Sequence, residues 1–447
     1  MADQRVDLTE GDLLKGIMRL AWPVVVANLL QTTYNIIDAF WLGKLGKEAF
    51  SAPTIAWPVI FTGISFAFGI SVAANSLVAQ YAGSGDKRSA EIVSAQSVVL
   101  SVFVSLLLIV VGLFFARPIL ALMGAEGEIL DLSTTYLQII LSGSPLMFAM
   151  FAAVGALRGW GNSKIAMNFT IISVLLNVVL DPLMIFGIGF PRMGVAGAAL
   201  ATVVSRSVAS VYGLYVLFSG RTGMKLHITD FKPRWNIMKK VFSVGLPVGF
   251  GNSVTSLGFT FIMGVVARFG PVVVSAYGVG NRIISVITMF SGGIAAAVAS
   301  AVGQSLGADK PDRAVSAVKI GSLVNFILVS IFCVFTFFFG KYLTKFFIND
   351  PQVIEMGEIF FRLVSFSVPF FATMQTVLAA LDGSGHTVKS TVVNIVRLWG
   401  VRVPVVIYMA RAFGFAGIFY AMIISNIAAL LLALSVVTFS RWQEKII

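Results

Sequence analysis

Long apolar stretches recur along the chain and are separated by short segments rich in glycine, proline and charged residues. Most stretches exceed the ~20 residues that an α-helix needs to cross a bilayer. Because lipid offers the backbone no hydrogen-bond partner, stretches of this kind can only be helices. Twelve spans are predicted, at residues 17–42, 51–80, 90–116, 130–157, 165–188, 194–218, 237–266, 273–306, 315–340, 353–381, 388–410 and 414–439. The pattern therefore predicts an all-α integral membrane protein with twelve transmembrane helices.

Composition supports this class and excludes several functions. Charged residues make up 12% of the 447 positions, about half the share of a soluble domain. Cys333 is the only cysteine, which excludes a disulfide framework and a cysteine-based metal site. His227 and His386 fall in predicted loops, so neither a zinc protease nor a histidine-driven active site is expected. We expect no enzyme activity and no cofactor other than a coupling ion.

Basic residues are shared unequally between the two sides of the membrane. Of the 32 Lys and Arg residues, 19 fall on the side of the N-terminus and 8 on the opposite side. The positive-inside rule then places both termini in the cytoplasm of a multi-pass protein of the plasma (inner) membrane. The net charge of +12 follows from this topology, so no nucleic-acid partner is expected. The polar, mixed-charge N-terminal segment is not typical of a cleaved signal peptide.

The chain repeats itself at an offset of 224 residues, which falls to 220 after the fifth span. Pro23 corresponds to Pro247, and Ala-Leu-Arg-Gly-x-Gly at 156–161 corresponds to Ala-Leu-Asp-Gly-x-Gly at 380–385. Six spans per half keep the two copies in the same orientation. This plan is typical of alternating-access transporters with two pseudo-symmetric six-helix bundles around a central cavity. We assign residues 1–219 to an N-lobe, 220–240 to a cytoplasmic linker and 241–447 to a C-lobe.

Polar residues interrupt the first span at helical spacing. They stand at i, i+3, i+4 and i+7 and so share one helix face: Gln31, Tyr34, Asn35 and Asp38. An ionisable group inside a bilayer is costly and usually marks an ion or substrate path. Pro23, earlier in the same span, can kink this helix, and we expect it to be a hinge between a straight and a bent form. The alternative is that it only shapes packing, since Pro247 holds the equivalent position without a nearby acid.

A second polar group lies in the fifth and sixth spans. Asn177 and Asp181 stand four residues apart and share a helix face, and Pro182 leaves a carbonyl free in the preceding turn. Counting ~1.5 Å per residue from the span ends puts Asp38, Asp181 and Thr202 at a similar depth. Two carboxylates, an amide and a hydroxyl at one depth predict a hard-oxygen site for a sodium ion or a shared proton.

The second half lacks this site. The repeat offset places Ile262, Val401 and Val405 at the positions of Asp38, Asn177 and Asp181. Its charges inside the spans are mostly cationic: Arg282, Arg362, Arg397 and Arg402. For these arginines the sequence leaves two roles open, namely contact with substrate, or snorkelling and hydrogen bonding to carbonyls.

With these features the chain resembles the multidrug and toxic compound extrusion (MATE) transporters over its whole length. The resemblance rests on the duplicated twelve-span layout, the polar first span, the two Gly-x-Gly motifs and Asn177-x-x-x-Asp181-Pro182. It implies a transporter that exports organic cations and amphipathic drugs in exchange for sodium ions or protons. The expected partners are these small molecules and membrane lipids, and the protein is expected to be a monomer.

The resemblance also implies roles for particular residues. One branch of the family carries its coupling acids in the seventh and tenth spans, but the seventh span here has neither Asp nor Glu. The chain instead resembles the DinF-like branch, whose coupling acids lie in the N-lobe. Cation binding is then implied at Asp38, Asn177, Asp181 and Thr202, and the substrate cavity at Gln31, Tyr34, Asn35 and Asp38.

The same residues bear on several alternative functions. A flippase for lipids or lipid-linked oligosaccharides needs a cavity that attracts pyrophosphate, and Arg282, Arg397 and Arg402 keep this alternative open. A major-facilitator transporter is disfavoured, because the loop at 81–88 lacks the Gly-x-x-x-Asp-Arg-x-Gly-Arg pattern. An intramembrane aspartyl protease needs a Gly-x-Gly-Asp motif in a span, and the one match, at 83–86, lies in a predicted loop. Composition alone does not exclude a receptor or a channel.

Overall fold

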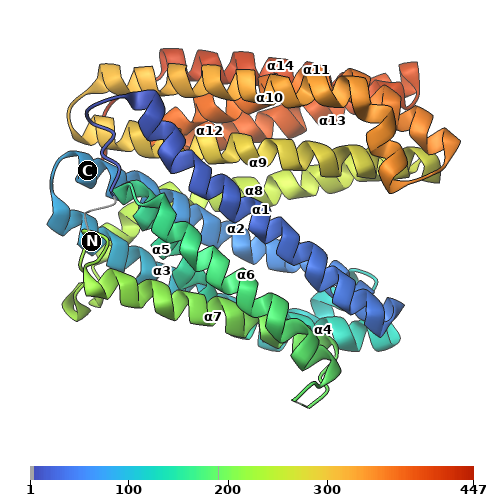
Figure 1. The fold of residues 1–447 in the computed structure, drawn as a ribbon, viewed down its shortest axis with the longest axis horizontal. Helices are drawn as coiled ribbons and strands as arrows, with labels where there is room; N and C mark the ends of the chain where they lie inside the picture. Colours follow the sequence, from blue (N-terminus) through green and yellow to red (C-terminus); the bar gives the residue numbers. More distant parts are fainter. Residues whose placement is uncertain (1–4, 190) are drawn as a thin grey trace. The chain divides into compact units, whose positions relative to one another are not determined.

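The computed structural model describes residues 5–189 and 191–447, and over these residues all regular structure is helical (Figure 1). The elements are α1 (Leu13–Leu45), α2 (Lys47–Gly83), α3 (Lys87–Leu122), α4 (Gly127–Ser142), α5 (Ser144–Trp160), α6 (Ser163–Phe186), α7 (Val195–Ser219), the 3₁₀ turn η1 (Ile228–Phe231), α8 (Trp235–Ala267), α9 (Pro271–Gly307), α10 (Pro311–Phe347), α11 (Pro351–Ser384), α12 (Thr387–Ile395), the π-helical turn η2 (Val396–Arg402), α13 (Val403–Phe413) and α14 (Ala416–Phe439). Within the described ranges, eleven segments are long and apolar enough to cross a membrane, and the bent pair α4–α5 makes twelve. The predicted all-α membrane fold is confirmed.

The fourth span is two helices, whereas the sequence predicted one. α4 and α5 meet at Gly143 with a bend of 52°. Pro145 has no N–H to offer the carbonyl of Leu141, and the hydroxyl of Ser144 donates to that carbonyl at 2.6 Å. The equivalent helix α11 contains Pro369 without a break, so proline alone does not bend the chain. The combination of glycine and proline permits the bend.

The chain divides into two compact units. The first comprises Val26–Gly249 together with residues 5–7, and the second comprises Leu8–Val25 and Phe250–Ile447. In the first unit α5 packs against α2, α3 and α7, and in the second α11 packs against α9, α10 and α14 (Figure 1). These helices correspond to one another in the sequence repeat, so each unit has the same packing scheme.

The repeated Gly-x-Gly motif owes its two glycines to two different constraints. A Cβ at Gly159 would stand 2.4 Å from the carbonyl oxygen of Asn75, and one at Gly383 would stand 2.3 Å from that of Ala299. The first glycine therefore lets two helix backbones touch. The second glycine, Gly161 or Gly385, ends its helix in the left-handed conformation, with φ of 93° and 84°.

Polar contacts to α3 fix the segment between α7 and α8 within the first unit. The guanidinium of Arg88 donates to both carboxylate oxygens of the fully buried Asp230. The amide of Gln96 donates to the backbone carbonyl of Asp230 at 2.6 Å, and Glu91 accepts from the backbone N–H of Lys225 at 2.8 Å. We call this set the α3 clasp.

Asp230→Asn is expected to destabilise the first unit by about 1–2 kcal/mol at neutral pH, because Arg88 loses a charged acceptor. Burial raises the pKa of Asp230, but hydrogen bonds from Arg88 and from the backbone of His227 outweigh it and hold the pKa below its usual value. A lowered carboxyl pKa stabilises the folded state above pH ~4, and this stabilisation is lost as the pH falls further. Thermal unfolding in detergent from pH 3 to pH 8 measures both effects.

The control for Asp230 is Asp131→Asn. Asp131 pairs with Arg117, but both side chains are more than half exposed. Such a surface pair contributes little, so this variant should unfold within about 0.5 kcal/mol of wild type. Equal stability of Asp230→Asn and Asp131→Asn at pH 7 would show that the α3 clasp does not stabilise the fold.

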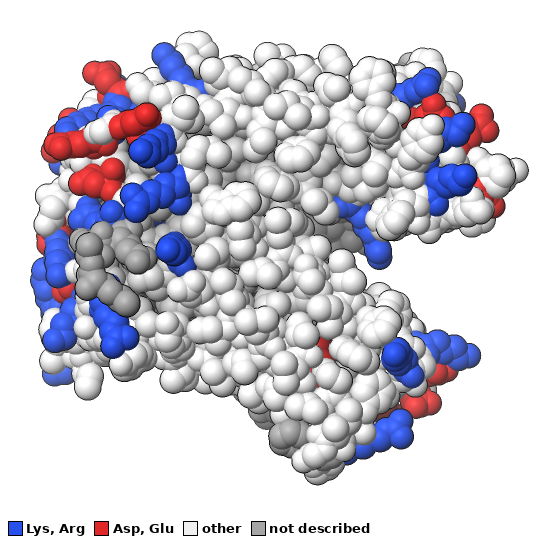
Figure 2. Space-filling view, in the orientation of Figure 1, with Lys and Arg blue, Asp and Glu red and all other residues white. Residues whose placement is uncertain are grey.

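Charged side chains gather at the helix ends, and the surface between them is almost free of charge (Figure 2). Large apolar side chains stand exposed along this uncharged surface, including Leu107 and Phe114 on α3 and Phe338 on α10. In water such surfaces would aggregate, whereas in a bilayer they contact lipid tails. The surface is therefore that of a protein that spans the membrane.

Candidate functional site

The polar face of α1 meets α7 through Tyr34. This side chain is 7% exposed, and its hydroxyl shares a hydrogen bond of 2.9 Å with the hydroxyl of Thr202. Asp38, one turn further on, is half-buried. Gln31 and Asn35 form a weak pair, with 3.5 Å between the amide nitrogen of Gln31 and the oxygen of Asn35. The four predicted residues thus lie on one face of one helix.

Asn177 connects the two helices α6 and α7. Its amide nitrogen donates to Asp181 at 3.0 Å and to the hydroxyl of Thr202 at 3.5 Å. All three side chains are at most 4% exposed. Gly197 on α7 lets the two helices approach closely. Any other residue would place a Cβ only 2.5 Å from the carbonyl oxygen of Met184 on α6. The structure therefore brings Asn177, Asp181 and Thr202 together, and Tyr34 joins them from α1.

Several oxygen atoms around this contact are buried and have no hydrogen-bond partner among the described residues. They are Asp38 Oδ1, Asn177 Oδ1, Asp181 Oδ2 and Ser205 Oγ. Three of the four can only accept hydrogen bonds while the carboxylates are ionised. Buried acceptors without donors are unfavourable unless a proton or a cation satisfies them. This arrangement suits a hard cation with oxygen ligands.

The charges at the site influence one another. The two carboxylates Asp38 and Asp181 lie close enough to repel, and Arg206 attracts Asp38. The Arg206 guanidinium stands over the ring of Tyr34 at 5.9 Å, a cation–π contact. The buried phenol of Tyr136 on α4 lies within electrostatic range of both acids. Among the described residues no group of three or more His, Cys, Asp or Glu forms a metal cluster, so a bound ion would depend on neutral oxygens as well.

A cavity of about 230 Å³ opens beside the site within the first unit. Gln31 and Asn35 line it, whereas the hydroxyl of Tyr34 is bonded to Thr202. The rest of the lining combines aromatic, thioether and basic groups, among them Trp57, Phe68, Met147, Met150, Phe151, Arg158 and Arg206. Such a wall suits an amphipathic molecule, because flexible apolar side chains adapt and a few polar groups orient the ligand.

Sequence reasoning missed Ser205, Arg206 and Tyr136 as neighbours of the site. Ser205 follows Thr202 by three residues on α7, and this spacing was the available signal. Arg206 follows Thr202 by four residues on the same helix, so the same spacing applies to it. Tyr136 lies on a different helix, and nothing in its own segment indicated the contact.

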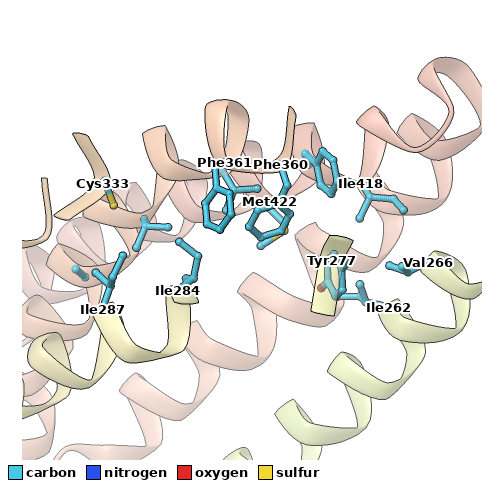
Figure 3. Close-up of a cluster of buried hydrophobic side chains, with 14 of the residues drawn as sticks. Ile262, Val266, Tyr277, Ile284, Ile287, Cys333, Phe360, Phe361, Ile418 and Met422 are labelled. Atoms are coloured by element: carbon cyan, nitrogen blue, oxygen red, sulfur yellow. The ribbon is translucent and has the colours of Figure 1, made fainter. Parts of the chain in front are cut away.

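The second unit has an apolar core where the first has the polar site. Ile262 and Met422, which correspond to Asp38 and Thr202, belong to one buried cluster with Tyr277 and Phe360 (Figure 3). Four aromatic contacts in this region are T-shaped, including that of Phe360 with Phe419 at 5.2 Å. Among the described residues, the second unit has no comparable group of carboxylates.

The family model described as MatE matches the chain twice, at residues 23–183 and 247–408, which together exceed half of its length. The chain belongs to the MATE family. The two matches begin 224 residues apart, at Pro23 and Pro247, as the sequence repeat does. Members of the MATE family are transporters, so the protein is a transporter and not an enzyme.

Individual MATE relatives align over nearly the whole chain. "Probable multidrug resistance protein YpnP" of Bacillus subtilis is 29% identical over 98% of this chain and 97% of its own length. "Probable multidrug resistance protein NorM" of Thermotoga maritima is 28% identical over 97% and 94%. A crystal structure of MATE in complex with MaL6 superposes with a TM-score of 0.91, at 27% identity, over 97% of this chain and 98% of that one. The fold is that of the MATE transporters.

Proposed function

We propose that the protein is a secondary active multidrug efflux transporter that exchanges amphipathic or cationic organic compounds for sodium ions or protons by alternating access. The names of the YpnP and NorM relatives, which describe multidrug resistance, support the substrate class. The observation that carries the proposal is the group of unpartnered buried oxygens beside an amphipathic cavity in the first unit. The oxygens suit the coupling ion, and the cavity suits the drug.

The coupling cation binds at Asp38, Asn177, Asp181 and Thr202, as in the DinF-like branch. Three of these residues and Tyr34 already form one hydrogen-bonded group. Asp38 lies on α1 with Gln31 and Asn35, which line the cavity. Occupation of the site by a cation changes the charge beside the cavity and so weakens the binding of a cationic drug. The gradient of sodium ions or protons then drives export.

Pro23 is the hinge of α1. The division between the two units falls inside α1 just after Pro23 and inside α8 just after Pro247. Proline removes a backbone hydrogen bond from a helix interior, which makes a bend cheap at that point. A bend at Pro23 moves the face that carries Gln31, Asn35 and Asp38. Cation binding and drug binding are thereby linked through one helix.

The protein resides in the plasma (inner) membrane with both termini in the cytoplasm and acts as a monomer. The excess of Lys and Arg on the side of the termini supports this orientation. The α3 clasp and the basic segment between α7 and α8 then face the cytoplasm, where anionic lipid headgroups attract basic residues.

Dye transport into proteoliposomes tests the proposal. A fluorescent organic cation should move against its gradient when a sodium or a pH gradient is imposed, and the effective gradient identifies the coupling ion. Asp38→Asn should reduce this transport by about 10-fold or more, since the change removes a charged ligand of the cation. Transport by Asp131→Asn, a surface carboxylate near the same end of the unit, should equal that of wild type.

The same experiment separates the alternative function. Wild-type protein that moves no dye under either gradient would contradict drug antiport. Arg158 and Arg206 in the cavity lining would then favour a lipid or a lipid-linked oligosaccharide as substrate. Normal transport by Asp38→Asn would contradict the assignment of the coupling site but leave the antiport itself intact.

A further inference from the structure

Two arginines are buried together in the interior of the second unit. Arg397 and Arg402 are 3% and 5% exposed and lie on the π-helical turn η2, in the middle of a membrane-spanning segment. A π-turn closes its hydrogen bonds between residues five apart, so it places side chains at i and i+5 on one side of the helix. The two guanidinium groups are close enough to repel each other. A charge at this depth is costly unless it is paired.

Arg402 is held by neutral groups only. Its Nε donates to the hydroxyl of Ser425 at 2.7 Å, and its Nη2 donates to the side-chain oxygen of Asn426. Asn426 in turn donates to Ser367 at 3.1 Å, which fixes the orientation of its amide. No carboxylate forms an ion pair with Arg402 among the residues that the structure describes. Its positive charge is therefore uncompensated.

Arg397 has still fewer partners. Its Nε is buried without any hydrogen-bond partner in the described part of the chain. Its guanidinium stands 4.9 Å from the ring centroid of Phe371, and among the described residues this cation–π contact is the one interaction seen to offset its charge. A buried guanidinium with an open Nε donor and a like charge nearby is suited to an anionic partner.

Packing keeps Arg397 in this position. The side chain of Leu398 packs on Gly258 of α8, and a Cβ at Gly258 would stand 2.3 Å from Cδ2 of Leu398. The indole N–H of Trp399 donates to the carbonyl of Val254 on α8 at 2.9 Å. The two residues that follow Arg397 are thus anchored on α8. The backbone of η2 is therefore fixed against α8.

The repeat relates this place to the cavity of the first unit. At the offset of 224 residues, Phe371 corresponds to Met147, and Met147 lines that cavity. Arg397 corresponds to Ser173 on α6. The aromatic partner of Arg397 thus occupies the position of a residue that lines the first unit's cavity, and Arg397 takes the position of a serine on the helix equivalent to its own.

We propose that Arg397, supported by Arg402, binds the phosphate group of an amphiphile, either a lipid headgroup or a phosphate-bearing solute. The planar fork of the guanidinium matches two phosphate oxygens, and the ring of Phe371 offers an apolar surface to the rest of the ligand. This site is separate from the proposed cation site in the first unit and carries a ligand of opposite charge. It does not depend on drug antiport.

Binding by the purified, delipidated protein in a neutral detergent tests the inference. The probes are inorganic pyrophosphate and short-chain phosphatidylglycerol, each measured by the shift it causes in the thermal unfolding midpoint. A shift with pyrophosphate identifies a phosphate-bearing solute, and a shift with phosphatidylglycerol alone identifies a lipid headgroup. If neither probe stabilises the wild-type protein, the inference is overturned, whatever the variants do.

The variants separate ligand binding from a structural role. Arg397→Gln should weaken the binding of the effective probe by about 10-fold or more, and without probe it should be no less stable than wild type, because an unpaired charge is removed. Arg397→Lys keeps the charge but loses the fork, so it should bind with intermediate affinity. Arg411→Gln, an exposed arginine of the same span, should behave as wild type. Loss of stability in Arg397→Gln with undiminished probe binding would show that Arg397 only supports the fold.

These binding measurements use no ion gradient and no dye. A negative result would therefore leave the antiport proposal standing.

Discussion

Asp181→Asn should make drug binding insensitive to the coupling cation. Asp181 is fully buried and accepts from Asn177 at 3.0 Å, and its second oxygen has no hydrogen-bond partner in the part of the chain that the structure describes. The asparagine keeps the shape but removes the charge that attracts a cation. Coupling between two ligands of one protein is typically about 1–3 kcal/mol, a change of roughly 5–150-fold in affinity. In the variant this factor should fall to about one.

Equilibrium binding of a fluorescent organic cation to detergent-purified protein measures this factor. The dissociation constant is determined with and without saturating sodium, and at two pH values, for each protein. Wild type should bind the dye more weakly when the coupling cation is present, and Asp181→Asn should bind it equally in both conditions. Asp131→Asn serves as the matched control. A cation effect of wild-type size in Asp181→Asn would exclude this carboxylate from the coupling site.

The sequence predicts only some of the contacts around Asp181. Helical spacing places Asn177 and Asp181 on one face, because i and i+4 are neighbours on any α-helix. Counting along the spans indicates the depth of Thr202, but it gives no helix rotation. The bond between Tyr34 and Thr202 depends on that rotation, and so does the unpartnered hydroxyl of Ser205.

The fold shows the same limit. Hydropathy predicts where the spans lie, because lipid leaves the backbone no choice but a helix. It does not predict the bend at Gly143, since Pro369 in the equivalent helix leaves that helix unbroken. Hydropathy also does not predict the π-turn that carries Arg397 and Arg402. That turn is held by tertiary contacts such as the hydrogen bond of Trp399 to α8, which the hydropathy of one segment does not reveal.

The two units share one duplicated framework but differ in the sign of the charges buried in it. Ser205 and Ser425 are equivalent in the repeat. Within the described ranges the hydroxyl of Ser205, in the unit that carries Asp38 and Asp181, has no hydrogen-bond partner. The hydroxyl of Ser425 accepts from the guanidinium of Arg402. The equivalent serine thus bonds to a fixed cation in the second unit, whereas in the first unit it belongs to the helix that carries Thr202. This contrast explains why coupling would be confined to one half.

Gly383→Ala should destabilise the second unit by about 1–3 kcal/mol, the usual cost of overpacking. A Cβ at this position would stand 2.3 Å from the carbonyl oxygen of Ala299 and 2.9 Å from its carbonyl carbon. These are backbone atoms of a neighbouring helix and cannot rotate away, so α9 and α11 must separate. Their contact is among the most extensive in the second unit, and the whole unit should feel the change.

Gly278→Ala is the matched control, because it lies in α9 of the same unit and a Cβ there meets nothing within 4 Å. Alanine favours a helix over glycine by about 1 kcal/mol, so this variant should be as stable as wild type or more stable. Cys333, the only cysteine, is buried in the second unit and reacts with a thiol-specific fluorophore when that unit unfolds. Thermal scans should therefore show early labelling in Gly383→Ala and unchanged or later labelling in Gly278→Ala. If the two variants label at the same temperature, close backbone contact is not what the first glycine of the motif provides.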